Sequence, residues 1–463
     1  MASRLLLSLG LLTYVGATAL PPTDGGSQGF VSFPIEHKRS LVPLLRRQDT
    51  EVPLYNISVL SYLISLSIGT PGQQTKVAID TGSDELWVNP QCSTVQVSSQ
   101  RSECQANGQY QPSSSSTSKV SDTTNHIPYG KGEVTIQYIQ DSISVPDSSI
   151  SMTKVVFGAA LKSSQLPEGI MGLGFGKGVN LQYNNFVDTL FTQNVTKSRA
   201  FTIALGSADA SNGGAIIFGG VDAKRFSGRL ARVPILGPQG KETIRRYWVQ
   251  MEGISHAGKT YSGSSMPIVI DSGSSLSSLP QGVVDQMASD TGAQWDSQAG
   301  VYIVPCSILS SGGSFDFTFG NGSSSTTGGS LAKISVPYSE FVWQAGGECA
   351  LGAVPIKSGS GVTALLGDSF MRAASITFDQ TSNSMYLAQY ASCGDGGARA
   401  IAADAAGLDG MAGECGQGQG VGSAGEGGGG KKNAAGSRAA PPRALWVGGA
   451  VAAVVAQIVM GAL

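Results

Sequence analysis

Short apolar runs alternate with Gly, Ser, Thr and Asn along most of the chain. The runs are rich in Val, Ile, Thr and Tyr and are bounded by turn-forming residues, a pattern typical of β-strands. Two of them, residues 77–79 and 266–270, end at an aspartate, Asp80 and Asp271. A carboxylate at the end of a buried strand is costly unless it is paired or takes part in chemistry. The pattern therefore predicts a mainly β chain and singles out these two positions.

The two aspartates stand in the same motif. The chain reads "VAIDTGSDELWV" at 77–88 and "VIDSGSSLSSLP" at 269–280, so each apolar run leads into Asp, then Thr or Ser, Gly and Ser. A single copy is typical of an Asx-type turn that closes a strand. Two copies, each after an apolar run, are rare by chance even in a chain rich in Gly and Ser.

Two aspartates that meet in one cleft would share a proton and titrate as a unit. Such a pair can activate a water for attack on a carbonyl, one carboxyl accepting a proton while the other donates one. Glycine lets backbone approach a carboxylate closely, and hydroxyl groups can donate hydrogen bonds that hold its orientation. We predict that these supporting roles fall to Thr81, Gly82, Ser83, Ser272, Gly273 and Ser274.

Composition narrows the class of protein. The 463 residues are 41% hydrophobic and 13% charged, enough to bury a large core in two or three units. The net charge of −2 gives no electrostatic support for a nucleic-acid partner. With three His and no cysteine pair at metal-ligand spacing, a metal site or a His relay is poorly supplied, so we expect no metal and no cofactor.

The motifs and several further segments resemble the pepsin family of aspartic proteases. In that family each motif is answered by two apolar residues and a glycine that pack behind it, and here "IMG" at 170–172 and "LLG" at 365–367 match. The segment "IPYGKGEVTIQYIQDSISV" resembles the flap hairpin of the family, and "RYWVQMEGI" and "ASITFDQTSNSMYLAQ" resemble segments of its second lobe. The likeness covers roughly residues 60–392 and has the form of an internal duplication.

The resemblance implies an all-β, bilobal fold of two antiparallel β lobes with the active-site cleft between them. It implies a monomeric aspartic endopeptidase that hydrolyses peptide bonds in proteins, is most active in acid, and uses Asp80 and Asp271 as its catalytic pair. Tyr129 matches the flap tyrosine, which in the family hydrogen-bonds a Trp at the position of Trp87. The expected substrate-binding residues are Gly130, Lys131, Gly132 and Ser275.

Departures from the family pattern affect specificity more than chemistry. Ser272 and Ser274 stand where the family more often has Thr, which keeps the hydroxyl groups. Lys131, Glu133 and Ile136 alter the flap. The alternative function is a pepsin-like pseudoenzyme that binds without cleaving. Such a protein would be expected to lose an aspartate, the flap tyrosine or the hydroxyls, and this chain keeps them all.

The N-terminus reads as a processing region. Residues 1–19 combine Arg4, an apolar stretch and a small-residue ending, which predicts a signal peptide. Residues 20–47 are predicted to be a propeptide that ends at the dibasic Arg46–Arg47, with Lys38–Arg39 as another dibasic pair; ordinary surface basic pairs are the alternative. The N-terminal lobe is then expected at 48–235 and the C-terminal lobe at 236–393.

The C-terminus predicts a surface anchor. Residues 394–433 are Gly- and Ala-rich, the composition of a flexible linker. Residues 434–463 have the pattern of a GPI-anchor signal that is removed on maturation, with attachment at Asn433 or, second, Gly436. A retained tail helix is the alternative. Together with the N-terminal signals, this layout resembles the cell-surface aspartic proteases of fungi, including yapsins.

Six cysteines fit disulfide formation in the secretory pathway, though six allow fifteen pairings. We predict Cys92 with Cys104 and Cys306 with Cys349, and leave Cys393 and Cys415 open. Three sequons predict glycosylation at Asn56, Asn194 and Asn321.

Overall fold

The structure is a computed structural model that describes most of the two predicted lobes. The described residues are 29–41, 58–89, 91–96, 98–130, 132–146, 148–208, 214–297, 299–320, 332–345, 347–356, 363–394 and 396–416. Several predicted features lie outside these ranges: the signal peptide at 1–19, Arg47, Asn56, Lys131, Asn321, Asn433, Gly436 and the tail at 434–463.

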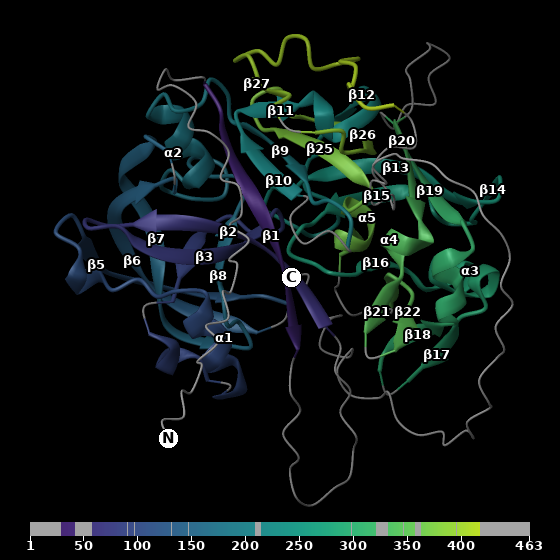
Figure 1. The fold of residues 1–463 in the computed structure, drawn as a ribbon, viewed down its shortest axis with the longest axis horizontal. Helices are drawn as coiled ribbons and strands as arrows, with labels where there is room; N and C mark the ends of the chain where they lie inside the picture. The colour runs from purple at the N-terminus through teal and green to yellow at the C-terminus, as the bar shows by residue number, and fades with distance from the viewer. Residues whose placement is uncertain are drawn as a thin grey trace, which may run out of the picture.

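The largest sheet in the described ranges has 13 strands and runs through both halves of the molecule. Across the sheet, in order, it contains β12 (Phe226–Pro234), β26 (Ser384–Tyr390), β25 (Ala374–Asp379), β9 (Ala200–Ala204), β10 (Gly214–Phe218), β1 (Val31–Leu41), β2 (Ser58–Ile68), β3 (Gln73–Asp80), β8 (Gly169–Gly172), β4 (Leu86–Val88), β7 (Ser151–Ser164), β6 (Glu133–Ser144) and β5 (Lys119–Pro128). Figure 1 shows β1 running between the two halves. Strands from both ends of the chain therefore share one sheet.

The second half of the chain contributes two further sheets within the described residues. The eight-stranded one contains β20 (Ala332–Pro337), β19 (Ser314–Gly320), β13 (Trp248–His256), β15 (Met266–Ile270), β24 (Leu365–Leu366), β16 (Ser277–Pro280) and β23 (Ala353–Ile356), with β14 (Lys259–Thr260) paired to β13. The four-stranded one contains β17 (Gln294–Asp296), β18 (Val301–Val304), β22 (Glu348–Ala350) and β21 (Trp343–Ala345). Figure 1 shows these strands opposite the β5–β8 half. The fold is all-β and bilobal, as predicted.

Helices are few and short in the part of the chain that the structure describes. They are α1 (Arg101–Ala106), α2 (Phe186–Thr192), α3 (Gln281–Thr291), α4 (Tyr338–Phe341) and α5 (Asp368–Met371). The longest, α3, ends where Gly292 takes a left-handed conformation with φ of 67°, which suits a residue without a Cβ. Within the described residues, no helix has the length and apolar character needed to span a membrane.

The two halves repeat one arrangement of strands behind the aspartates. Strand β3 pairs in parallel with β8, which sets Asp80 opposite Gly172. Strand β15 pairs in parallel with β24, which sets Ile270 opposite Leu366. The "IMG" and "LLG" segments thus lie directly behind the motif loops, as the sequence predicts.

Aromatic packing joins the halves at the shared sheet. The rings of Phe201 and Phe378 stack at 5.0 Å, and Tyr247 packs edge-on against Phe378 at 4.8 Å. All three side chains are buried. Large buried aromatic pairs contribute more than their area alone, so this cluster fixes one lobe against the other.

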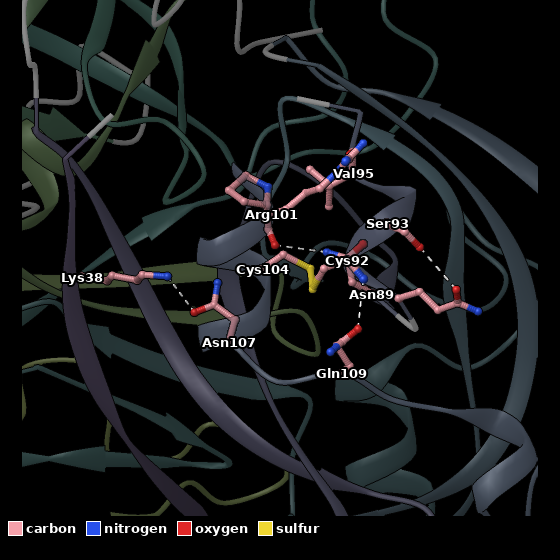
Figure 2. The surroundings of a disulfide bond; sticks show 11 residues. Lys38, Asn89, Cys92, Ser93, Val95, Arg101, Cys104, Asn107 and Gln109 are labelled. Carbon is pink, nitrogen blue, oxygen red and sulfur yellow. Dashed lines mark hydrogen bonds between the residues drawn. A yellow bond between two sulfur atoms is a disulfide. The ribbon is translucent and has the colours of Figure 1, made fainter. Parts of the chain in front are cut away.

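Strand β1 falls in the range predicted as propeptide and is built into the shared sheet. Val31, Phe33 and Ile35 are buried, and the strand pairs with β10 on one side and β2 on the other. Lys38 donates a hydrogen bond to Asn107 at 2.8 Å, beside the Cys92–Cys104 disulfide (Figure 2). The strand is therefore held by backbone pairing along its length and by a side chain at its end.

The range predicted as a linker begins with a folded segment. Strand β27 (Ala398–Ala400) pairs with β11 (Gly220–Asp222), and Ile401 and Leu408 are buried against Phe226. Cys393 forms a disulfide with Cys415 across this segment. A few large apolar side chains and one disulfide thus fix residues whose average composition is that of a flexible chain.

Candidate active site

The two motif loops meet at the junction of the lobes with their aspartates buried. Asp80 is 6% exposed and Asp271 is 5% exposed. The backbone N–H of Gly82 donates to Asp80 Oδ1 at 2.8 Å, and that of Gly273 donates to Asp271 Oδ1 at 2.9 Å. Each carboxylate is therefore held in the same way by its own loop.

Thr81 and Ser272 tie the two loops together. The N–H of Thr81 donates to Ser272 Oγ at 3.1 Å, and the N–H of Ser272 donates to Thr81 Oγ1 at 2.9 Å. Their hydroxyls in turn donate across the interface to the carbonyl oxygens of Ile270 and Ile79. The prediction that these two hydroxyls bond the carboxylates is wrong, because both point into the opposite loop and are used there by backbone groups.

Gly82 and Gly273 lie against the aspartate of the other loop. A Cβ on Gly82 would stand 2.6 Å from Asp271 Oδ1, and a Cβ on Gly273 would stand 2.3 Å from Asp80 Oδ1. Real Cβ atoms do not approach oxygen so closely. The predicted close approach between glycine and carboxylate is present. Each glycine makes room for the carboxylate of the opposite loop rather than for that of its own loop.

The second serine of each motif differs between the loops. Ser83 Oγ donates to Asp80 Oδ2 at 2.5 Å. Ser274 Oγ donates instead to the carbonyl oxygen of Leu276 at 2.9 Å. The prediction that the Ser274 hydroxyl orients a carboxylate is therefore wrong, because the loop after Asp271 turns this hydroxyl onto its own backbone.

The electrostatic environment favours a protonated Asp271. Burial raises the pKa of Asp271, and the neighbouring Asp80 carboxylate raises it further. The Gly273 N–H and the Arg246 guanidinium lower it, but less. Two carboxyls this close cannot both ionise readily, so the arrangement stabilises one shared proton.

The flap residue Tyr129 is fixed by Trp87. Trp87 Nε1 donates to Tyr129 Oη at 2.8 Å, the contact that the resemblance implies. The Tyr129 N–H donates to the carbonyl oxygen of Gly132 at 2.9 Å, which closes the hairpin tip. Lys131, at that tip, lies outside the described residues.

A cleft of about 480 Å³ opens onto these groups. Its lining brings together side chains and backbone from both lobes, including Asp80, Asp271, Tyr129, Gly130 and Ser275. It has room for an extended segment of peptide, with both carboxyls exposed to whatever lies in it. Across the described ranges, no cluster of three or more His, Cys, Asp or Glu could hold a metal ion.

Sequence comparison agrees with this geometry. Residues 61–390 match the family described as eukaryotic aspartyl protease. The chain belongs to this family. It is an aspartic-type endopeptidase, and its substrates are peptides or proteins.

Fungal proteins are among the relatives of the protease. "Secreted aspartic protease 8" of Candida albicans is 34% identical over 352 residues, which are 75% of this chain and 80% of the relative. "Probable aspartic-type endopeptidase opsB" of Aspergillus oryzae is 30% identical, over 83% of this chain and 81% of the relative. The crystal structure of aspartic proteinase from Irpex lacteus has the same fold, with a TM-score of 0.60 at 18% identity over 78% of this chain and 97% of that one.

Three polar residues of the protease site were not foreseen from the sequence. Arg246 donates from the second half of the chain to the carbonyl oxygen of Gly82 at 2.5 Å. Asp84 accepts hydrogen bonds from Phe175 N–H and from Asn180. Asp368 lines the cleft, and burial raises its pKa well above its usual range. Asp84 directly follows "DTGS" and Asp368 directly follows "LLG", so their positions next to these motifs could have pointed to the site. No sequence feature pointed to Arg246, because only the folding of the chain brings it close to the motif loops.

The predicted disulfides and one sequon fall within the described residues. Cys92 pairs with Cys104 at an S–S distance of 2.12 Å, and Cys306 pairs with Cys349 at 2.09 Å. Asn194 follows α2 and is exposed. The side chain is therefore accessible, as the predicted glycosylation requires.

Proposed function

We propose that Asp80 and Asp271 are the catalytic pair of this aspartic endopeptidase. The observation that carries the proposal is the crossed arrangement of the two carboxyls, each fixed by its own loop and each lying against the glycine of the other. A site of this kind is preorganised before substrate binds, which is where most of the catalytic effect of oriented groups arises.

The proton distribution assigns a role to each carboxyl. Asp271, with its pKa raised, holds the proton, and Asp80 is ionised and held by Ser83. Asp80 accepts a proton from a water as the water oxygen attacks the substrate carbonyl carbon, and Asp271 donates its proton to the carbonyl oxygen. When the C–N bond breaks, Asp80 returns its proton to the leaving nitrogen, and Asp271 regains one from the gem-diol. No covalent intermediate with the protein is formed.

The pH optimum is proposed to be acidic, on the acid side of the raised pKa of Asp271. Activity requires one proton on the pair, so it falls as pH rises through the raised pKa of Asp271 and falls again once both carboxyls are protonated at low pH. Thr81, Gly82, Ser272, Gly273 and Ser274 would support the pair by fixing the loops, and Tyr129 with Trp87 would close the flap over substrate. Substrate backbone would be bound by Gly130, Lys131, Gly132 and Ser275.

Substitution of either aspartate tests the catalytic assignment. We expect Asp80→Asn and Asp271→Asn each to lower kcat by at least about 1000-fold on a peptide library, because each removes one partner of the proton transfer. Asp316→Asn, which removes a carboxylate paired with Lys333 on the surface, is the matched control. Undiminished cleavage by either active-site variant across pH 3–8 would overturn the proposal.

We further propose that the protease is secreted as a glycosylated zymogen, anchored at the cell surface by GPI and active as a monomer. The layout would be signal 1–19, propeptide 20–47, lobes 48–235 and 236–393, the folded segment that the Cys393–Cys415 disulfide closes, the remainder of the linker up to residue 433, and anchor signal 434–463. Support comes from the terminal sequence patterns, the three disulfides and the relatives named as secreted proteases.

Enzymatic release from cells tests the anchor. Phosphatidylinositol-specific phospholipase C should release the wild type from the cell surface, whereas a chain ending at residue 416 should appear in the medium without treatment. Asn433→Gln should reduce surface display if Asn433 is the attachment residue, with Gly436→Gln as its comparison. Retention of wild type on the membrane after phospholipase treatment would favour the tail helix instead.

A further inference from the structure

Gly82 of the first motif loop is held by a side chain from the second half of the chain. Arg246, which lies just before β13, donates from Nη1 to the Gly82 carbonyl oxygen at 2.5 Å. The two residues are 164 positions apart, and both line the active-site cleft. Across the described residues, no side chain donates to the corresponding carbonyl oxygen of Gly273 in the second loop. The bond from Arg246 is therefore a feature of the first loop only.

The rest of Gly82 lies against the two aspartates. Its N–H donates to Asp80 Oδ1 at 2.8 Å. Its Cα faces Asp271, since a Cβ at this position would stand 2.6 Å from Asp271 Oδ1. One residue thus lies between the two carboxyls and the guanidinium of Arg246. A shift of the Gly82 peptide would disturb the surroundings of both carboxyls at once.

Arg246 is itself fixed by an acidic partner. Its Nε lies 3.2 Å from Oε1 of Glu242, four residues earlier. The Glu242 carboxylate also accepts hydrogen bonds from Trp248 Nε1 at 2.9 Å and from Thr363 Oγ1 at 3.1 Å. Because a guanidinium is planar and carries N–H groups in fixed directions, it can bind the carboxylate and the carbonyl oxygen at the same time. The contacts therefore form a chain from Glu242 through Arg246 to the loop of Asp80.

Arg246 also acts on the neighbouring carboxyls through its charge. The charged and titratable groups that face it or the aspartate pair are Asp80, Asp84, Tyr129, Glu242, Asp271 and Asp368. Burial raises the pKa values of Asp84 and Asp271, and Arg246 lowers both. Burial also raises the pKa of Asp368, which Arg372 lowers. Arg246 thus favours ionisation of carboxyls that burial would otherwise keep protonated.

We propose that Arg246, held by Glu242, is a positioning residue of the protease that fixes the Gly82 peptide and places a permanent positive charge beside the aspartate pair. The inference rests on the proposed function, because the pair that Arg246 supports is the proposed catalytic pair. Loss of the charge makes ionisation of Asp271 less favourable, so the basic limb of the pH–rate profile moves to higher pH. Loss of the bond to Gly82 leaves the Asp80 loop less well fixed, so kcat falls.

Two substitutions of Arg246 separate its charge from its geometry. Arg246→Gln removes both, so we expect kcat to fall about tenfold and the basic limb of the kcat/KM profile to move up by about half a pH unit. Arg246→Lys keeps the charge but not the planar group, so kcat should fall about threefold while the basic limb stays within about 0.2 pH units of the wild type. Both profiles are measured on one peptide between pH 3 and pH 8 at constant ionic strength.

Glu242→Gln tests the same contact from its other side. It removes a negative charge beside Arg246, so the basic limb should move to lower pH, by about 0.3 pH units. Arg225→Gln is the matched control, because Arg225 Nε lies 3.4 Å from Asp222 and its side chain is 15% exposed, against 17% for Arg246, but it does not line the cleft. The control should keep the wild-type profile.

Three results would overturn the inference. The first is an unchanged profile in Arg246→Gln. The second is an equal shift in Arg246→Gln and Arg246→Lys, which would mean that the charge is not involved. The third is a shift in the same direction in Arg246→Gln and Glu242→Gln, which would indicate a loss of structure rather than the loss of two opposite charges.

A titration without turnover separates this inference from the catalytic proposal. Infrared difference spectra follow the C=O band of a protonated carboxyl, and the band that is missing in Asp271→Asn belongs to Asp271. A midpoint about half a pH unit higher in Arg246→Gln than in the wild type supports the inference even if Asp271→Asn still cleaves peptides. An unchanged midpoint together with loss of cleavage in Asp271→Asn supports the catalytic pair and rejects the role of Arg246.

Discussion

Asp80 and Asp271 end equivalent strands, β3 and β15, and each accepts a hydrogen bond from the glycine two residues further on. Behind each loop lies a parallel strand, β8 or β24, and each glycine faces the opposite aspartate. Away from the backbone the two loops differ. Asp80 has the Ser83 hydroxyl and the Tyr129 flap beside it, whereas Asp271 has a serine turned away and Asp368 behind it.

This difference shows how a duplicated frame can perform acid–base chemistry that requires two unlike groups. The repeated backbone places both carboxyls at one point with matched orientation. The unlike surroundings then favour the protonated form at Asp271, where burial dominates, whereas the Asp80 carboxylate accepts a hydrogen bond from a hydroxyl. The repeated backbone therefore sets the positions of the two carboxyls, and the differences in their surroundings determine which of them holds the proton.

Substitution of the glycine that both motif loops share should have the largest effect on kcat. Gly82→Ala and Gly273→Ala each place a Cβ within 2.6 Å or less of the opposite carboxylate, so that carboxylate must move. We expect either change to lower kcat by about 100-fold or more, since small misplacements of catalytic groups cost about that much. Gly237→Ala, where a Cβ meets nothing within 4 Å, is the control for kcat measurements. Near-normal turnover by one of the two variants would show that the frame is not used symmetrically.

The serine pair tests the asymmetric part directly. Ser83→Ala removes a donor to the ionised Asp80 and should lower kcat by about tenfold, with the acid limb of the pH–rate profile moved to higher pH. Ser274→Ala removes a bond to a backbone oxygen and should change kcat by about twofold or less. Equal losses in the two variants would mean that the serines act only on loop structure.

The flap offers a smaller test, because Tyr129 is held through its bond with Trp87 and lies in the cleft beside the aspartates. Tyr129→Phe removes the acceptor for Trp87 Nε1 and should lower kcat/KM by about fivefold through a less ordered flap. Tyr261→Phe also removes a buried hydroxyl, one bonded to Asp290 in the other lobe, and should leave kcat/KM unchanged. If both variants lose the same activity, loss of stability rather than flap closure explains the effect.

Much of the repeated arrangement of strands and motif loops could be predicted from the sequence alone. Apolar runs that end in a repeated Asp-Thr/Ser-Gly-Ser motif are local signals, and so are the glycines and the paired "IMG" and "LLG" segments. Strand β27 could not be predicted, because the few apolar residues that fold it are diluted by Gly and Ala around them. Average composition describes a segment poorly when two or three side chains and a disulfide decide its conformation.

The roles of the hydroxyls and of Arg246 depended on contacts between distant parts of the chain. Thr81 and Ser272 lie 191 residues apart, and Arg246 lies 164 residues from Gly82. A motif tells which groups are present in a loop but not which way each side chain turns once a second loop packs against it. For Ser83 and Ser274 the same motif position therefore led to two different hydrogen bonds.

Asp84 and Ser275 occupy equivalent positions in the two motifs. The difference between them gives the test with the smallest expected effect, which is on the pH dependence of stability. Burial, the largest contribution, raises the pKa of Asp84 to about 6, while Asn180, Phe175 N–H and Arg246 oppose the rise. An unfolded Asp titrates near pH 3.9, so between about pH 4 and pH 6 the folded state binds more protons than the unfolded state. The contribution of Asp84 to stability then falls as pH rises through that window and levels off above it.

Asp271 and Asp368, whose pKa values are also raised, act in the same direction as Asp84. The melting temperature of the wild type should therefore decline from pH 4 to pH 6, measured by calorimetry at constant ionic strength. Asp84→Asn, which places an uncharged side chain at that position, should reduce the decline by about 3 °C, whereas Asn in place of the exposed Asp122 should not change it. A wild-type melting temperature that rises across this window would show that the proton at the N-terminal motif is not held as the burial of Asp84 requires.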